Sequence, residues 1–111
     1  MKSSFAEYVV NDLMADIEGI KARAMFGGHG IYKDGLFFAL IADDELYFKV
    51  DDSNRKDFQS RGSEPFKYTG KDKKVTVMSH WKLPPEIMED RGELGEWTDK
   101  AVSVARKAKK K

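Results

Sequence analysis

The chain has 111 residues, of which 41% are hydrophobic and 12% aromatic, and it contains no cysteine. This length suits one domain with a single core, and the lack of cysteine excludes disulfides and thiolate metal sites. No segment approaches the ~20 apolar residues of a membrane span, and Glu7, Asp12 and Asp16 interrupt the N-terminal segment where a signal peptide needs an apolar stretch. We therefore expect a soluble, cytoplasmic protein that does not associate with membranes.

The N-terminal segment predicts an amphipathic helix over residues 4–18. Ser4 and Glu7 have the spacing of a capping box, and apolar residues recur every four positions from Phe5 to Ile17. Gly19 should end this helix. The alternation in residues 21–26 then predicts a first strand.

The middle of the chain predicts an antiparallel meander. Asp34-Gly35 lies between two runs of β-formers, and such a pair is a strong signal for a tight hairpin because both turn positions need positive φ. The acidic residues 43–45 should separate a third strand from a fourth. A short helix follows, begun by Asp52 or Ser53 and ended by Gly62, with Phe58 as its anchor in the core.

The C-terminal part predicts two more strands and a final helix. Residues 65–69 and 74–81 read as strands around the turn 70–72, and Pro84-Pro85 ends the second of them. Residues 86–90 fit a helical turn, and the apolar stripe from Leu94 through Trp97 to Ala108 marks an amphipathic helix. The expected fold class is α+β: an antiparallel sheet of about five or six strands flanked by N-terminal and C-terminal helices. Residues 1–108 should form one domain, and residues 109–111 a frayed basic tail.

The aromatic residues of the expected strands should be divided between the two sheet faces, because side chains alternate along a strand. They are Tyr32, Phe37, Phe38, Tyr47, Phe48, Phe66 and Tyr68. One face must pack under the helices. The other is either covered by the terminal helices or used for dimerisation, so a homodimer is one expectation.

The glycine-rich and histidine positions give little support for catalysis. Gly27, Gly28 and Gly30 lack the spacing of a phosphate-binding loop and precede a strand, so a bulge or sharp bend is the favoured interpretation. His29 and His80 are the only histidines, too few for a zinc site without cysteine. We expect no catalytic residue, no metal and no cofactor.

Basic residues form the candidate contacts to a partner or to nucleic acid. Residues 100–111 hold six Lys or Arg and no acid, whereas the rest of the chain has 14 basic against 19 acidic residues. Such clusters attract phosphate generically and usually serve solubility. The candidate contact residues are His29, Arg55, Lys56, Lys71, Lys73, Lys74, Lys107, Lys109 and Lys110.

In its order of motifs, nearly the whole chain resembles the N-terminal domain of TfoX/Sxy-type competence regulators. The most specific segments are MFGG at 25–28, LYFKVD at 46–51, NR at 54–55, PFKY at 65–68 and PPE at 84–86. The resemblance implies an α+β domain and an association with regulators of natural competence. Full-length regulators of this kind carry a further helical C-terminal domain, and we expect this chain to be a stand-alone N-terminal domain without it. His29 stands where an aromatic residue is common in the family.

Three functions follow from this sequence. The favoured one is a non-enzymatic module that binds a protein partner, linked to transcriptional regulation, with the sheet and its loops as the binding surface. The second is nucleic-acid binding through the basic tail and turns, whose affinity would fall steeply with salt. The third is a small-molecule-binding or weakly catalytic domain that uses the groove near His29.

Overall fold

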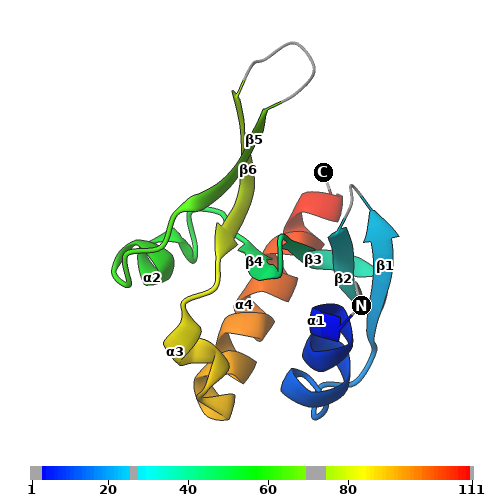
Figure 1. Cartoon of the computed structure of the whole chain (residues 1–111). Helices are drawn as coiled ribbons and strands as arrows, with labels where there is room; N and C mark the ends of the chain where they lie inside the picture. Colours follow the sequence, from blue (N-terminus) through cyan, green and yellow to red (C-terminus); the bar gives the residue numbers. More distant parts are fainter. Residues whose placement is uncertain (1–3, 26–27, 70–74, 111) are drawn as a thin grey trace.

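The computed structural model describes residues 4–25, 28–69 and 75–110 of the chain. A six-stranded antiparallel sheet and the helices that pack against it form the domain (Figure 1). This confirms the α+β class expected from the sequence. In chain order the elements are α1 (Ser4–Tyr8), the π-helix η1 (Val9–Leu13), β1 (Ile20–Met25), β2 (Gly28–Lys33), β3 (Leu36–Ala42), β4 (Glu45–Lys49), α2 (Arg55–Gln59), β5 (Pro65–Thr69), β6 (Val75–Lys82), α3 (Pro85–Met88) and α4 (Arg91–Lys110).

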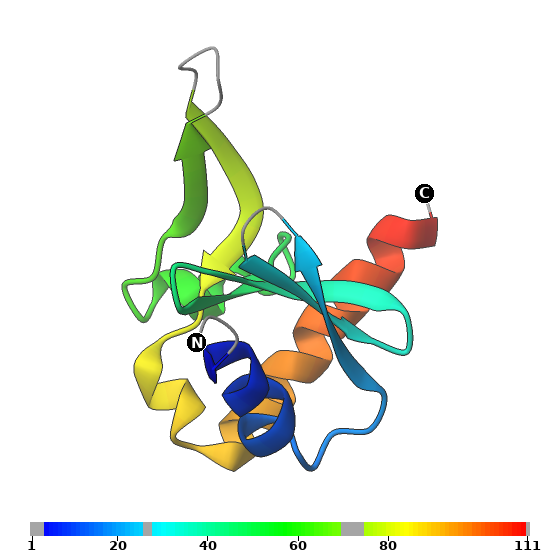
Figure 2. The same ribbon diagram turned by 45° about the vertical axis from the view of Figure 1, so that its right-hand side comes forward.

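The strands are arranged in the order β1-β2-β3-β4-β6-β5, and every pair is antiparallel. β1 to β4 form a meander of consecutive strands. β6 pairs with β4 only over its last residues, where Lys49 lies opposite His80. Beyond this short contact, the arm made of β5 and β6 rises away from the meander (Figure 2).

Two tight turns define the meander. Asp34 and Gly35 have φ of 51° and 84°, which confirms the expected hairpin with two positive-φ positions. A second such turn joins β3 to β4, where Asp43 and Asp44 have φ of 52° and 60°. Aspartate tolerates this left-handed conformation better than most residues, so the acidic pair that interrupts the sequence also makes the turn. The expected turn at residues 70–72 lies outside the described residues.

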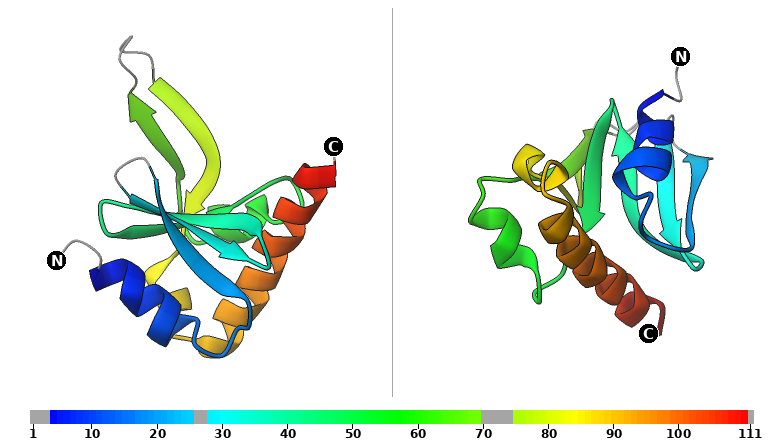
Figure 3. Two further views of the ribbon diagram at one scale, coloured as in Figure 1. Left: turned by 90° about the vertical axis from the view of Figure 1, so that its right-hand side faces the viewer. Right: turned by 90° about the horizontal axis from the view of Figure 1, so that it is seen from below.

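The core lies between one face of the meander and the helices. Phe38 and Phe48 are fully buried and contact each other edge to face, with ring centroids 5.7 Å apart. From the helical side the core receives Val9, Leu13 and the apolar stripe of α4. Figure 3 shows α1, α3 and α4 on the same side of β1 to β4. The terminal helices therefore cover one sheet face, as expected.

The N-terminal helix is shorter than the sequence pattern predicts. Helical structure ends at Leu13 rather than at residue 18, and its second half is a π-helix in which Met14 N–H donates to the Val9 carbonyl over 2.8 Å. The π-helix has a wider turn than an α-helix, and this wider turn places Val9, Leu13 and Met14 together on the buried side.

The C-terminal helix is longer than expected at both ends. It begins at Arg91, where the Asp90 carboxylate accepts a hydrogen bond from Glu93 N–H over 3.1 Å, and it continues to Lys110. Helical structure thus extends beyond Ala108, into the segment that we expected to fray.

Phe58 should be a principal anchor between α2 and α4. Its ring is buried and meets the Trp97 ring of α4 edge to face, with centroids 4.7 Å apart. We expect Phe58→Ala and Trp97→Ala each to lower the free energy of unfolding by about 3 kcal/mol or more, because each leaves a cavity in the core. Denaturant melts measure this loss. The matched control is Tyr8→Ala, since Tyr8 is an exposed aromatic residue; equal losses for all three variants would contradict the anchoring role.

The hairpin turn provides a second test. Gly35→Val places a β-branched side chain at φ of 84°, although no atom lies within 4 Å of the added Cβ. We expect a loss of about 1–3 kcal/mol, caused by backbone strain and not by a clash. In the control Gly95→Val, the same side chain enters helix α4 at a position that is also open. A similar loss in both variants would show that positive φ is not the cause.

Candidate functional site

A bulge in β3 decides which side chains face the core and which face away from it. The pairing of β2 with β3 steps from Ile31 opposite Ala39 to Tyr32 opposite Phe37, so Phe38 has no partner on β2. A bulge of this kind lets two successive residues face the same side of a sheet. Phe38 and Ala39 accordingly both belong to the core, and Phe37 packs with Tyr32 on the opposite face.

We call this opposite face the outer face, and define it by Tyr32, Phe37, Leu40, Tyr47, Phe66 and His80. Its rings come from five strands, β2 to β6, and their contacts form two groups: the centroid distances are 5.3 Å for Tyr32 and Phe37, 5.1 Å for Phe37 and His80, and 4.9 Å for Tyr47 and Phe66. No helix in the described part of the chain crosses this face (Figure 3). The outer face thus carries two groups of aromatic rings, Tyr32 with Phe37 and His80, and Tyr47 with Phe66.

His80 is the most unusual polar residue of the outer face. Only 2% of its surface is exposed, and neither ring nitrogen has a hydrogen-bond partner among the described residues. Burial lowers the pKa of His80 to about 4, and the neighbouring Lys49 ammonium adds to this effect. The imidazole is therefore neutral at pH 7 and packs as an aromatic ring against Phe37.

Charged groups border the outer face on β4 and β6. Lys49 Nζ donates to the Ser79 hydroxyl over 3.4 Å, and Lys82 pairs with Glu45 over 3.3 Å. Burial, followed by the Glu45 carboxylate, raises the pKa of the Tyr47 phenol, which therefore remains a neutral donor. Polar groups on β4 and β6 thus lie beside the aromatic rings of the outer face.

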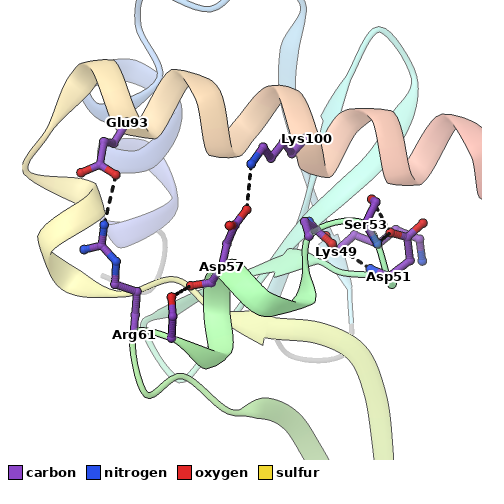
Figure 4. A network of polar contacts seen from close by, with 9 residues as sticks. Lys49, Asp51, Ser53, Asp57, Arg61, Glu93 and Lys100 are labelled. Atoms are coloured by element: carbon purple, nitrogen blue, oxygen red, sulfur yellow. Dashed lines mark hydrogen bonds and ion pairs between the residues drawn. The ribbon is translucent and has the colours of Figure 1, made fainter.

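The loop after β4 is held by a buried asparagine. Asn54 is 2% exposed; its side-chain oxygen accepts from Asp51 N–H over 2.9 Å, and its amide donates to the Lys49 carbonyl over 3.2 Å. The Asp51 carboxylate in turn accepts from both the N–H and the hydroxyl of Ser53 (Figure 4). This role of Asn54 was not predicted from the sequence, although a run of Asp, Ser and Asn after a strand is a signal for such side-chain turns.

The expectation that Asp52 or Ser53 caps the short helix is wrong. Asn54 is the residue that precedes α2, and none of its side-chain atoms caps the helix. The Asp51 carbonyl instead accepts from Arg55 N–H over 3.0 Å. Asp52 and Ser53 are drawn into other contacts, Asp52 with the Arg55 guanidinium and Ser53 with Asp51.

Ion pairs fasten the α2 segment to the C-terminal helices. Lys100 Nζ lies 2.9 Å from Asp57, and Arg61 lies 3.2 Å from Glu93 of α4 (Figure 4). Arg61 also pairs with Glu86 of α3 at 3.2 Å. The Arg61 guanidinium also lies over the Trp97 ring, 5.9 Å from its centroid. These exposed pairs contribute little individually, so they orient α2 more than they stabilise it.

The structure separates the basic residues that the sequence analysis singled out. Arg55 and Lys107 meet at the loop after β4, where they pair with Asp52 and with Asp51. His29 lies apart from them on β2, half-buried, between Ala24 and Ile41. Lys56 is exposed on α2, Lys109 is exposed on α4, and α4 ends at Lys110. Lys71, Lys73 and Lys74 lie outside the described residues.

Gly28 has a packing role in β2. A Cβ atom at this position would lie 1.9 Å from the Ile41 carbonyl oxygen on β3, a distance that excludes any side chain. Close approach of two strands therefore accounts for this glycine without a ligand. Gly27, its neighbour in the sequence, lies outside the described residues.

Within the described ranges, no group of three or more histidine or acidic residues is placed to hold a metal ion. The described part of the chain also contains no helix that is both long and apolar enough to cross a membrane.

His80 makes the stability of the domain depend on pH. Its pKa of about 4 in the folded chain lies below the ordinary value of 6.5, so the unfolded chain binds the proton first as the pH falls. The stability held by neutral His80 is complete above pH 6.5 and is lost between 6.5 and 4. We expect a loss of about 2–3 kcal/mol between about pH 7 and pH 4.5, a loss absent from His80→Phe. Denaturant melts of both proteins over this pH range give the free energy of unfolding, and its difference between them removes the contribution of the carboxylates that they share. Identical pH profiles would contradict the role of His80.

Comparison with known proteins supports the resemblance seen in the sequence. The family model of the TfoX N-terminal domain matches residues 12–105. A search of curated proteins gave no match. The match spans the sheet, the α2 segment and most of α4. The chain therefore belongs to the TfoX N-terminal domain family.

Proposed function

We propose that this chain is a non-enzymatic protein-binding module of the cytoplasm that contributes to transcriptional regulation, and that its partner protein binds the outer face. One observation carries this proposal: two groups of aromatic rings, half-buried except for the buried His80, lie on the sheet face that no described helix covers. Aromatic residues are enriched at sites of protein association relative to the rest of a protein surface. The family supports the regulatory part of the proposal, since its members include competence regulators.

The chemistry of the outer face suits binding better than catalysis. His80, its buried titratable group, is neutral and packs against a ring, while Tyr47 retains its proton. Tyrosine and phenylalanine supply large contact areas with little loss of side-chain entropy, and they are enriched at protein interfaces. Lys49 and the Glu45–Lys82 pair would form a polar rim around the aromatic contacts.

Nucleic-acid binding is the second candidate, favoured by the end of α4. Helix α4 carries four basic residues close together, Arg106, Lys107, Lys109 and Lys110; Lys107 pairs with Asp51, and Arg106 and Lys109 have no ion pair within the described residues. Phosphate contacts made in this way are non-specific, with dissociation constants of about 10⁻⁴ to 10⁻⁶ M at physiological salt.

The proposal predicts that charge on the outer face abolishes partner binding. We expect Tyr32→Glu and Tyr47→Glu to remove the proteins that the wild-type chain retains from native cytosol at moderate salt, because a carboxylate cannot be desolvated against an apolar partner surface. The measurement is affinity capture with quantitative mass spectrometry, after melts have shown that both variants fold.

Two controls separate the candidate functions. Tyr8→Glu adds the same charge to an exposed aromatic residue on α1, and it should leave the retained proteins unchanged. Deletion of residues 107–111 should also leave them unchanged. Salt-resistant DNA binding that disappears with this deletion would overturn the protein-binding proposal in favour of the second candidate.

A further inference from the structure

Strand β1 is an open edge of the sheet. It pairs with β2 through residues Ile20 to Met25, and no other described strand adjoins it. The opposite edge, β5, begins with Pro65, which has no N–H to offer a further strand. β1 contains no proline or glycine, so its full length can accept another strand.

The hydrogen-bond pattern shows which backbone groups are open. Asp34 N–H donates to the Gly19 carbonyl over 3.0 Å, so these opposite residues form a hydrogen-bonded pair. Such pairs alternate along an antiparallel ladder, which places the bonds to β2 at Lys21 and Arg23. The N–H and C=O groups of Ala22 and Ala24 then point away from the sheet. Their methyl side chains leave room for a partner backbone.

The side chains of β1 are charged on one face and small on the other. Lys21 lies opposite Tyr32, so Lys21 and Arg23 are on the same side of the sheet as the outer face. Residues 21–24 are all exposed. Neither Lys21 nor Arg23 takes part in an ion pair within the described part of the chain.

We propose that the open edge of β1 binds an extended acidic segment of a partner protein by strand addition, with carboxylates opposite Lys21 and Arg23 and small apolar side chains beside Ala22 and Ala24. The inference rests on the proposed protein-binding function and names the chemistry of the partner. Opposite charges directly across a strand pair stabilise it, and backbone bonds to an exposed edge supply sequence-independent affinity.

Charge also argues against a second copy of this chain as the occupant. A symmetric dimer would pair β1 with β1 in antiparallel orientation about a two-fold axis. With Ala22 opposite Ala22 of the second copy, each Lys21 would face an Arg23 on the same side of the sheet. Like charges in that position destabilise strand pairing.

The test uses a capped peptide of alternating Glu and Val, matched to β1 in length, with fluorescence anisotropy as the readout. We expect binding to the full chain, and a loss of roughly tenfold or more when Lys21→Glu and Arg23→Glu are combined. The same variant should gain affinity for a peptide of alternating Lys and Val. Arg106→Glu together with Lys109→Glu, the matched control on α4, should leave binding of the acidic peptide within about threefold, because these residues lie outside the sheet.

Backbone pairing is tested separately from charge. Ala22→Pro removes an N–H that points away from β2, so the fold should survive while peptide binding is lost. If this variant does not fold, the wild-type chain can be tested with the acidic peptide N-methylated at alternate residues. N-methylation removes the peptide N–H groups that would bond to β1, so binding should again be lost. Hydrogen exchange supplies a further readout: the amides of Ala22 and Ala24 should exchange quickly in the free chain and become protected by the peptide.

Several results would overturn the inference. These are no binding of the acidic peptide, binding that survives both backbone tests, and concentration-dependent dimerisation of the wild-type chain that Ala22→Pro abolishes. If the peptide fails while Tyr47→Glu still removes retained proteins, the edge inference is wrong and the proposed function stands. If neither the peptide binds nor Tyr47→Glu has an effect, both are wrong.

Discussion

The bulge at Phe38 determines which side chains of β3 enter the core and which lie on the outer face. Without it, strict alternation would place Phe37, Ala39 and Ile41 on one face of β3, and the core would lose the Phe38 ring that packs against Phe48. With the bulge, β3 contributes Phe38 and Ala39 in succession to the core, while Phe37 joins Tyr32 and His80. One extra residue thereby produces both a dense core and the aromatic outer face.

The segments that carry the family resemblance mainly account for the fold. In the run from Leu46 to Arg55, the apolar residues alternate into the core, and Asp51 and Asn54 close the loop onto the end of β4. A buried asparagine that satisfies two backbone groups is costly to replace, because either group would then be buried without a partner. This run therefore specifies how α2 meets the sheet, and the segments that carry the resemblance contribute two rings to the outer face, Tyr47 and Phe66.

The sequence predicted those features that depend on local chemistry. Asp34-Gly35 specified its hairpin because few residues tolerate positive φ, and the stripe ending at Ala108 specified α4 because its apolar side chains recur at helical spacing. It did not reveal the π-helix at Val9 or the bulge at Phe38, since both are set by packing between distant segments. The aromatic composition of the site was visible in the sequence. Its division between the faces was not, because one bulge reverses the alternation for the rest of a strand.

The net charge does not show which basic residues of this chain are free to bind a partner, whereas the distribution of the charges does. The chain carries a formal charge of only +1. Arg55, Arg61, Lys100 and Lys107 all have acidic partners on the helical side, so much of the positive charge there is balanced locally. Lys21 and Arg23 have none within the described chain, and they lie on an open strand edge where like charges oppose pairing with a second copy. Lys21 and Arg23 would repel the same residues of a second copy, so they oppose self-association at this edge. For the same electrostatic reason, a segment that pairs with this edge must carry negative charge opposite them.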